Sequence, residues 1–277
     1  MKFGFGLALS AALASGAVAF AQPTQPTSSQ STPPPPRYLA GYLPGKAVPS
    51  SLSIVPPAPA AGSATQARDD AEAKAARALK GSPRWDLARQ DADLHFPAAA
   101  ETFSCAVGAR ISPETTPRLY ILMRRTLTDA GLATYPTKTK YSRQRPFMVA
   151  GGDICTPDEA GGLRTDGSYP SGHSAIGWAW ALILAEADPD RENDILARGR
   201  SFMQSRVVCN VHWLSDTEAG ATVGAAVVAR LHDDPVFLAD LAAAKTEISA
   251  ARAANLAPAR DCKAEAAALA QTPETHP

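Results

Sequence analysis

The chain has 277 residues, 45% of them hydrophobic, which suits one globular domain with additional segments or two small domains. Its 27 basic and 27 acidic residues balance, so it lacks the net positive charge typical of proteins that bind nucleic acid or anionic membranes. It contains no C-x-x-C or H-E-x-x-H pattern, which gives a zinc site little support. We therefore predict no metal site, no cofactor, no binding to nucleic acid polymers and no membrane association.

Residues 1–21 have the features of a cleavable secretory signal peptide. Lys2 supplies the positive start, residues 3–20 are apolar and small, and Ala19-Phe20-Ala21 matches an A-x-A cleavage site. This pattern predicts cleavage after Ala21 and a periplasmic or secreted protein. A membrane anchor is the competing interpretation, which the short, alanine-rich apolar run and the polar sequence behind it disfavour.

Residues 22–62 are rich in proline, serine and threonine. The first part of such a segment buries too little apolar surface to offset the entropy of ordering it, so we expect a disordered or polyproline-like leader. The later part, residues 38–57, carries apolar side chains such as Tyr42 and Leu43. We expect this part to pack as an extended strip on the folded body.

From residue 63 onwards the pattern is helical. Helices are predicted at residues 69–79, 84–93, 97–107, 112–131, 174–187, 189–203, 217–231 and 235–254. Ser112 and Pro113 favour a start at residue 112, with serine as the cap and proline at the first helical position. The apolar run at 174–187 is too short to span a bilayer, which predicts a buried core helix. Because no period-2 strand pattern is present, we predict an all-α fold: one compact helical domain at 63–256 and a tail at 257–277.

Residues 135–169 are rich in proline and glycine, and long irregular segments inside a compact domain are commonly functional. A first cluster of charges lies here, with Lys138 and Arg145 seven residues apart and Lys140 and Arg143 between them. Such a run is compatible with a solvated basic loop. It is also compatible with two cations, Lys138 and Arg145, that hold the oxygens of a phosphoryl group.

A second cluster, Pro170-Ser171-Gly172-His173, directly precedes the apolar helix. The free N–H groups and the dipole of a helix N-terminus favour an anion at this place. Gly172 permits close approach of the backbone, and Ser171 adds a hydroxyl donor. The tetrapeptide is equally compatible with an ordinary capped helix start that carries a surface histidine.

A third cluster lies at residues 205–216 and contains Arg206, His212 and Asp216. If this stretch is helical, the four-residue spacing places His212 and Asp216 on one face, where the carboxylate can hold one imidazole nitrogen. The planar guanidinium of Arg206 suits a tetrahedral oxyanion such as phosphate.

The four cysteines favour disulfides, because the chain is expected to be exported. They are Cys105, Cys155, Cys209 and Cys262, and they allow three pairings. Our hypothesis pairs Cys105 with Cys155 and Cys209 with Cys262, which would fasten each half of the chain.

Together the three clusters supply the groups that phosphoryl transfer without a metal requires. We predict His212 as the nucleophile, Asp216 as the carboxylate that orients it, and His173 as the general acid. The predicted contacts to the phosphoryl group come from Lys138, Arg145, Ser171, Gly172 and Arg206.

The motifs K-x6-R-P, P-S-G-H and S-R-x5-H-x3-D occur in this order, and they resemble the phosphatidic-acid-phosphatase type 2 superfamily, which includes the vanadium haloperoxidases. The surrounding sequence, including R-W-D-L-A-R-Q-D-A-D-L and G-S-Y-P-S-G-H, is similar to the bacterial class A non-specific acid phosphatases over residues 38–250. Every motif position is matched, and Ser174 stands where many relatives carry threonine.

The resemblance implies an all-helical fold, a phosphohistidine intermediate on His212 and acid catalysis by His173. It implies an acid phosphatase (a phosphoric monoester hydrolase) that acts on a broad range of small-molecule phosphate esters, with transfer to alcohols as a side reaction. The sequence does not rank nucleotides, sugar phosphates and aryl phosphates. Alanine-rich helical surfaces and the resemblance favour a homodimer.

Three alternatives remain open at this point. A vanadium-dependent haloperoxidase would use the same groups to hold vanadate, although such enzymes are usually longer. A membrane lipid phosphatase is disfavoured because the sequence offers no transmembrane spans. A non-catalytic phosphate-binding module would require neither a nucleophile nor an acid, which the two motif histidines and Asp216 disfavour.

Overall fold

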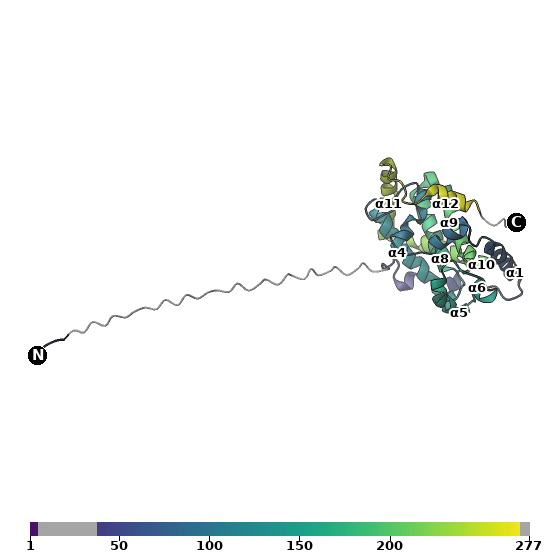
Figure 1. Cartoon of the computed structure of the whole chain (residues 1–277), viewed down its shortest axis with the longest axis horizontal. Helices are drawn as coiled ribbons and strands as arrows, with labels where there is room; N and C mark the ends of the chain where they lie inside the picture. The colour runs from purple at the N-terminus through teal and green to yellow at the C-terminus, as the bar shows by residue number, and fades with distance from the viewer. Residues whose placement is uncertain (5–37, 272–277) are drawn as a thin grey trace. The chain divides into compact units, whose positions relative to one another are not determined.

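The computed structural model describes residues 1–4 and 38–271, and within these ranges it contains helices and no strand, which confirms the predicted all-α class (Figure 1). Most of the predicted signal peptide, its cleavage site and the first part of the predicted leader lie outside the described residues. The following paragraphs concern residues 38–271.

The α-helices, in chain order, are α1 (Ala64–Arg77), α2 (Pro83–Asp91), α3 (Ser104–Val107), α4 (Pro117–Ala133), α5 (Tyr135–Tyr141), α6 (Pro146–Val149), α7 (Ala160–Thr165), α8 (Gly172–Ala187), α9 (Glu192–Val208), α10 (Leu214–Leu231), α11 (Pro235–Ala253) and α12 (Cys262–Leu269). Short 3-10 helices lie at Gly45–Ala47, Ser51–Ser53, Ala98–Phe103, Pro157–Glu159 and Pro189–Arg191.

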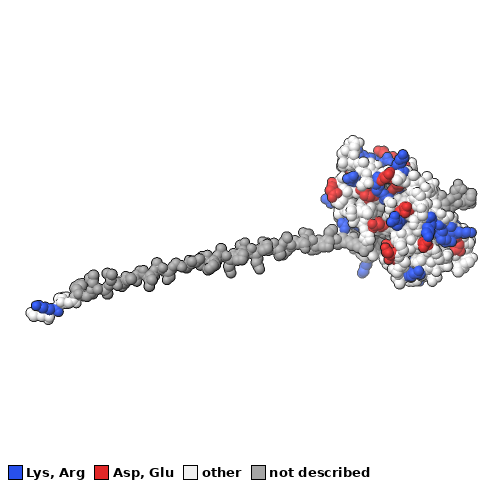
Figure 2. Space-filling view, viewed as in Figure 1, with Lys and Arg blue, Asp and Glu red and all other residues white. Residues whose placement is uncertain are grey.

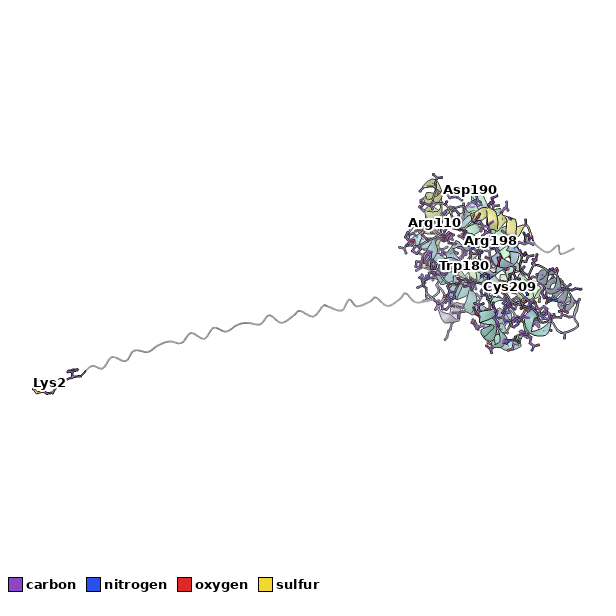
Figure 3. All side chains as sticks on the ribbon, in the orientation of Figure 1. Lys2, Arg110, Trp180, Asp190, Arg198 and Cys209 are labelled. Carbon is purple, nitrogen blue, oxygen red and sulfur yellow. A yellow bond between two sulfur atoms is a disulfide. The ribbon has the colours of Figure 1, made fainter. Side chains whose placement is uncertain are left out.

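Helix α8 lies in the middle of the helical body and packs against α4, α9 and α10 (Figure 1). Its sequence is apolar on nearly every face, which is the pattern of a helix surrounded by protein. Trp180 is fully buried, and its Nε1 donates a hydrogen bond of 2.9 Å to the carbonyl of Met123 on α4 (Figure 3). The prediction of a buried core helix at this position is therefore confirmed.

Glycines allow α10 to lie very close to the start of α8. A Cβ atom at Gly220 would lie 2.5 Å from the carbonyl oxygen of Ser171, and one at Gly224 would collide with the carbonyl of Ala175. This close approach lets the N–H of Ser171 donate a 2.9 Å hydrogen bond to the carbonyl of Asp216 in the first turn of α10. Two of the predicted motifs are thus joined directly through their backbones.

The extended strip at residues 38–57 lies against α4 and α11. The N–H of Tyr42 donates to Asp129 on α4 (2.8 Å), and its hydroxyl donates to Asp240 on α11 (2.7 Å). The Arg125 guanidinium lies 3.6 Å from the centroid of the Tyr42 ring. These contacts fasten the segment that precedes the helical body to its surface.

Three predicted elements differ from the structure. The helix expected from residue 112 begins instead at Pro117, because the Ser112 hydroxyl accepts the N–H groups of Glu114 and Thr115 and stabilises a separate turn. The segment 135–169, expected to be irregular, contains the short helices α5, α6 and α7. The range 257–277, expected as a tail, contains α12.

The predicted disulfide pairing is wrong. The structure joins Cys105 to Cys262 and Cys155 to Cys209, with Cα–Cα distances of 5.4 and 4.8 Å. The reason is the fold: α12 returns beside α3, and the loop before α7 lies against the end of α9, so cysteines distant in the sequence become neighbours. Cys209 nevertheless has the structural role expected of it (Figure 3).

The distribution of charged side chains on the surface agrees with the equal numbers of basic and acidic residues in the sequence. Lysine and arginine side chains are interspersed with aspartate and glutamate on the face shown in Figure 2. In the part of the chain that the structure describes, no helix is long and apolar enough to cross a membrane.

Candidate active site

A cavity of about 440 Å³ opens where α4, α5, α8 and α9 meet. All three sequence clusters contribute to its lining. Its charged and histidine side chains are Lys138, Arg145, Asp166, His173, Arg206 and His212. The fold thus brings together five of the predicted site residues that carry titratable side chains, together with one aspartate that was not predicted.

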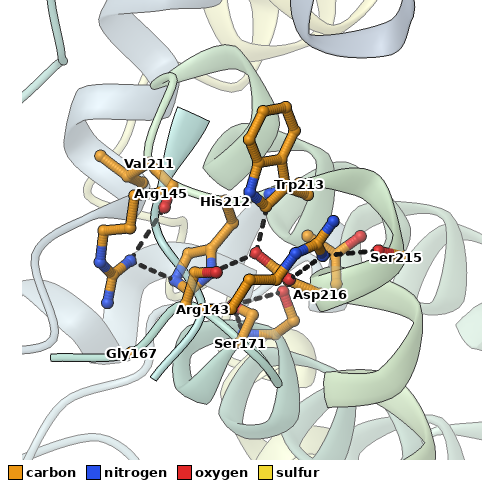
Figure 4. Close-up of polar contacts among 12 residues, drawn as sticks. Arg143, Arg145, Gly167, Ser171, Val211, His212, Trp213, Ser215 and Asp216 are labelled. Carbon is orange, nitrogen blue, oxygen red and sulfur yellow. Dashed lines mark hydrogen bonds and ion pairs between the residues drawn. The ribbon is translucent and has the colours of Figure 1, made fainter. Parts of the chain in front are cut away.

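His212 lies in the turn between α9 and α10, so the stretch 205–216 is not one continuous helix. The sequence argument placed His212 and Asp216 on one face only if residues 205–216 were helical, and they are not. The two residues meet for another reason: Asp216 stands in the first turn of α10, and its Oδ2 accepts the N–H of Trp213 (2.9 Å). This hydrogen bond turns the carboxylate towards His212, whose Nδ1 lies 3.4 Å from Oδ2 (Figure 4).

The two ring nitrogens of His212 have different partners. Nε2 lies 2.9 Å from Nη1 of Arg145, and a guanidinium only donates hydrogen bonds. Nε2 therefore carries a lone pair, while Nδ1 carries the proton and faces Asp216. Burial and the positive charges of Arg145 and Lys138 lower the pKa of His212 well below its usual value. The imidazole is consequently neutral and has the tautomer that a nucleophile requires.

Asp216 is fully buried and is held from several sides. Its Oδ1 accepts from Nη1 of Arg143 at 2.6 Å, and its Oδ2 accepts the N–H of Trp213. Burial raises the pKa of Asp216 above its usual value, and Arg143 acts in the opposite direction. The sequence interpretation missed Arg143, which it placed in the basic run without a role. Its position two residues before Arg145 was the available signal.

Lys138 on α5 and Arg145 before α6 converge on a shared carboxylate. Asp166 Oδ2 lies 3.0 Å from Nζ of Lys138 and 3.0 Å from Nη2 of Arg145. Burial and the neighbouring Arg145 lower the pKa of Lys138 to about 8. The side chain of Asp166 is 41% exposed, whereas the two cations are buried. One partly exposed carboxylate therefore neutralises two buried cations, and the sequence interpretation missed this residue.

Arg206, in the last turn of α9, is buried beside the cavity. None of its Nε, Nη1 and Nη2 atoms has a partner among the residues that the structure describes, although the side chain is only 1% exposed. Burial and the nearby Arg145 lower the pKa of Arg206 to about 10. Buried charged groups are normally paired, so this guanidinium marks a place prepared for an anion.

His173 is the second residue of α8 and is half-buried at the cavity. Its Nε2 donates to the carbonyl of Ala92 at 2.9 Å, which leaves Nδ1 to exchange a proton. Its enclosed position and the charge of Arg206 lower the pKa of His173 well below its usual value.

Gly172 and Ser171 differ in their access to the cavity. Gly172 lines it, whereas Ser171 is fully buried and is not among the lining residues of the described chain. The Ser171 hydroxyl caps α8 by accepting the N–H of Ser174 (3.2 Å). The role of Ser171 as a direct phosphate donor stays a prediction.

No group of three or more histidine, cysteine, aspartate or glutamate side chains within residues 1–4 and 38–271 is arranged to hold a metal ion.

Comparisons with known proteins agree with this geometry. Residues 119–236 match the model of the PAP2 superfamily. An acid phosphatase of Zymomonas mobilis is 43% identical over 205 residues, which cover 73% of this chain and 76% of that protein. A non-specific acid phosphatase of Providencia stuartii is 41% identical over 209 residues, 75% of this chain and 84% of that protein. One of Salmonella typhimurium is 44% identical over 173 residues, 62% of this chain and 69% of that protein.

The matched region contains all three clusters that line the cavity, and the match to the relatives extends over most of the chain. We conclude that the chain belongs to the bacterial acid phosphatases of the PAP2 superfamily.

Proposed function

We propose that this protein is an exported acid phosphatase that hydrolyses a broad range of phosphate monoesters through a phosphohistidine on His212, without a metal ion. The observation that carries the proposal is the unpaired, buried guanidinium of Arg206 in the same cavity as a neutral His212. Similarity to proteins named acid phosphatase supports the reaction class. The two disulfides support an oxidising compartment, in agreement with the predicted signal peptide at residues 1–21.

In the first step, the phosphoryl oxygens bind Lys138, Arg145 and Arg206. Arg145 turns from Nε2 of His212 to the phosphoryl group, which frees the lone pair. Nε2 then attacks phosphorus as the bond between phosphorus and the ester oxygen breaks. The proton on Nδ1 of His173 passes to the leaving oxygen, and Asp216 stabilises the positive charge on the phosphorylated imidazole.

In the second step, water attacks phosphorus and the phosphorus–nitrogen bond breaks. The neutral His173 takes the proton of the attacking water, and inorganic phosphate leaves with both histidines restored. An alcohol in place of water receives the phosphoryl group instead. This accounts for the proposed phosphotransferase side activity.

Charge compensation links binding to the acid step. Burial lowers the pKa of His173, and the charges of Arg206, Arg145 and Lys138 lower it further. A bound phosphoryl group brings negative charge that offsets these cations, so the pKa of His173 rises when the ester binds. The acid is thereby charged in the complex that needs it.

The rest of the cavity explains a broad substrate range. Apart from the charged and histidine side chains, most of its lining is apolar: Leu94, Leu127, Leu132, Tyr135, Leu163 and Ile176. Apolar contacts are not directional, so they accept leaving groups of different shapes, while the phosphoryl group provides the fixed contacts.

A chromogenic phosphate ester assay with and without EDTA tests the proposal. We expect turnover at acidic pH that EDTA leaves unchanged. Loss of turnover in EDTA, with recovery on adding a divalent metal, would contradict the mechanism. Halide oxidation with vanadate and peroxide, but no phosphatase activity, would identify a haloperoxidase. Phosphate binding without turnover would identify a binding module.

The expected homodimer is tested by light scattering on the protein as it elutes from a size-exclusion column.

A further inference from the structure

A row of buried charges lies behind the proposed nucleophile, and it begins on a helix remote in the sequence from all three motifs. Asp69 on α1 pairs with Arg143, and Arg143 pairs with Asp216. We propose that Asp69 is a positioning residue for the reaction, which acts through Arg143 and the first turn of α10 to hold Asp216 against His212. This inference rests on the proposed function, because it assigns a role in the same site.

One guanidinium joins the two carboxylates. Nη2 of Arg143 lies 2.7 Å from Oδ2 of Asp69. Its Nη1 lies 2.6 Å from Oδ1 of Asp216, and Figure 4 shows Arg143 and Asp216 side by side. Both aspartates are fully buried, and the Arg143 side chain is 9% exposed. A buried charge needs a nearby counter-charge and good hydrogen bonds. The two aspartates supply the counter-charge that holds Arg143, and Oε1 of Gln66 on α1 accepts a further hydrogen bond from Nη2 at 2.6 Å.

Asp69 also fixes the turn that carries Asp216. Its Oδ1 accepts the N–H of Ser215 at 2.8 Å, and its Oδ2 accepts the Ser215 hydroxyl. The Ser215 hydroxyl is itself 2.8 Å from Nη1 of Arg143. Ser215 is the second residue of α10, where N–H groups have no partner within the helix and a carboxylate is favoured by the helix dipole. Asp69 therefore caps α10 from another helix.

Asp69 contacts Arg143 and Ser215, and these two residues hold Asp216 in its position. Asp69 is not among the residues that line the cavity. His212 Nδ1 and Asp216 Oδ2 are 3.4 Å apart, which is long for a hydrogen bond. Their contact therefore depends on the residues that hold Asp216 in place. A displaced Asp216 would impair attack and leave phosphate binding intact.

The test uses Asp69→Asn in the mature chain. We expect kcat to fall by about 10- to 100-fold, by analogy with the loss that follows when the groups that orient metal-binding side chains are removed. KM and the inhibition constant of inorganic phosphate should change less than about threefold, because Lys138, Arg145 and Arg206 remain in place. A structural role alone would not produce this separation.

A double-mutant cycle with Arg143→Gln tests the route. Because Asp69 acts through Arg143 and also through Ser215, the double variant should lose less kcat than the product of the two single losses. Losses that multiply would contradict the proposal. Ser215→Ala is a milder second variant, and it decides the matter if Asp69→Asn does not fold. It removes one hydrogen bond of Asp69, so we expect kcat to fall roughly threefold with KM unchanged.

Asp188→Asn is the matched control. Asp188 is 2% exposed and pairs with Arg252, but it lies at the opposite end of α8 from His173. We expect it to lower the melting temperature and preserve kcat. An equal kcat in Asp69→Asn and Asp188→Asn, or a loss confined to KM, would overturn the role of Asp69. If the protein without any substitution shows no turnover, the proposed function is rejected, and the positioning role of Asp69 is rejected with it.

Discussion

At the scale of single residues, the cavity places Lys138, Arg145 and Arg206 around one neutral imidazole. The first two cations share Asp166, whereas Arg206 has no hydrogen-bond partner within the described residues. An unpaired buried charge opposes folding and favours binding of an anion, so the same side chain affects stability and activity in opposite directions.

Arg206→Met tests this opposition. Removing the unpaired charge should raise the melting temperature in phosphate-free buffer, while KM rises and kcat falls by at least about tenfold because one oxyanion contact is lost. Calorimetry and steady-state kinetics check the two effects.

Arg198→Met is the control for that variant. Arg198 is equally buried but pairs with Asp91 and Glu265, so the same substitution should destabilise the fold by about 3–5 kcal/mol. If Arg206→Met lowers the melting temperature as Arg198→Met does, Arg206 is a structural residue and the interpretation of the cavity is incorrect.

The pKa of His173 predicts different pH profiles for kcat/KM and kcat. The acid step needs charged His173, and in the free enzyme this form disappears as pH rises through a pKa well below the usual value of about 6.5. The alkaline limb of kcat/KM should therefore lie at acidic pH. Bound phosphoryl charge raises this pKa, so the alkaline limb of kcat should lie at least about one pH unit higher.

His212 limits the opposite side of both profiles. Its pKa is also well below the usual value, so it stays neutral, and able to attack, at acidic pH. The prediction is checked by measuring kcat/KM and kcat from about pH 4 to about pH 9. Both profiles are corrected for the second ionisation of the phosphate ester, which has a pKa of about 6. Coincident alkaline limbs, or an alkaline optimum, would contradict it.

At the scale of elements, the site depends on the contact between the start of α8 and the first turns of α10. Ser171 and Asp216 are joined through their backbones there, and Gly220 makes the approach possible. A change in this contact moves the anion-binding helix start and the orienting carboxylate relative to each other.

Gly220→Ala tests the helix contact. The new Cβ would lie 2.5 Å from the Ser171 carbonyl, where a backbone must shift, so we expect a loss of about 1–3 kcal/mol in stability and a lower kcat. Gly161→Ala in α7 is the matched control, since its Cβ meets no atom within 4 Å and should stabilise the helix slightly. Thermal unfolding of both variants decides, and equal melting temperatures would contradict the packing argument.

The sequence is informative about local features and less so about the groups that the fold brings together. The three motifs and the core helix at 174–187 were predictable, because capping residues, charge spacing and apolar runs act over a few residues. Asp69 and Asp166 were not, since they meet Arg143 and Lys138 only through packing of separate segments. The cysteine pairing failed for the same reason, as proximity in the fold decides it.

At the scale of the whole molecule, two disulfides connect distant segments, and the Cys155–Cys209 bond lies beside His212. Cys209 ends α9 three residues before His212, and Asn210 donates to the carbonyls of Gly151 and Asp153 in the loop that carries Cys155. The Cys155–Cys209 bond therefore fastens the turn that carries His212, whereas Cys105–Cys262 fastens α12.

Removing each disulfide separately tests this difference. Replacing Cys155 and Cys209 by serine should cost about 4 kcal/mol, from a sequence separation of 54, and should also lower kcat. Replacing Cys105 and Cys262 should lower the melting temperature and preserve kcat of the folded protein. Equal effects on kcat would contradict a role of the first bond in positioning His212.

The covalent intermediate is the most direct test of the proposed reaction. A rapid quench into base during turnover of an aryl phosphate, followed by peptide mass spectrometry, should find a phosphoryl group on His212. The label should be absent from His212→Ala, which should still bind inorganic phosphate through Lys138, Arg145 and Arg206. A phosphoryl group on any other residue, or full turnover by His212→Ala, would contradict the account.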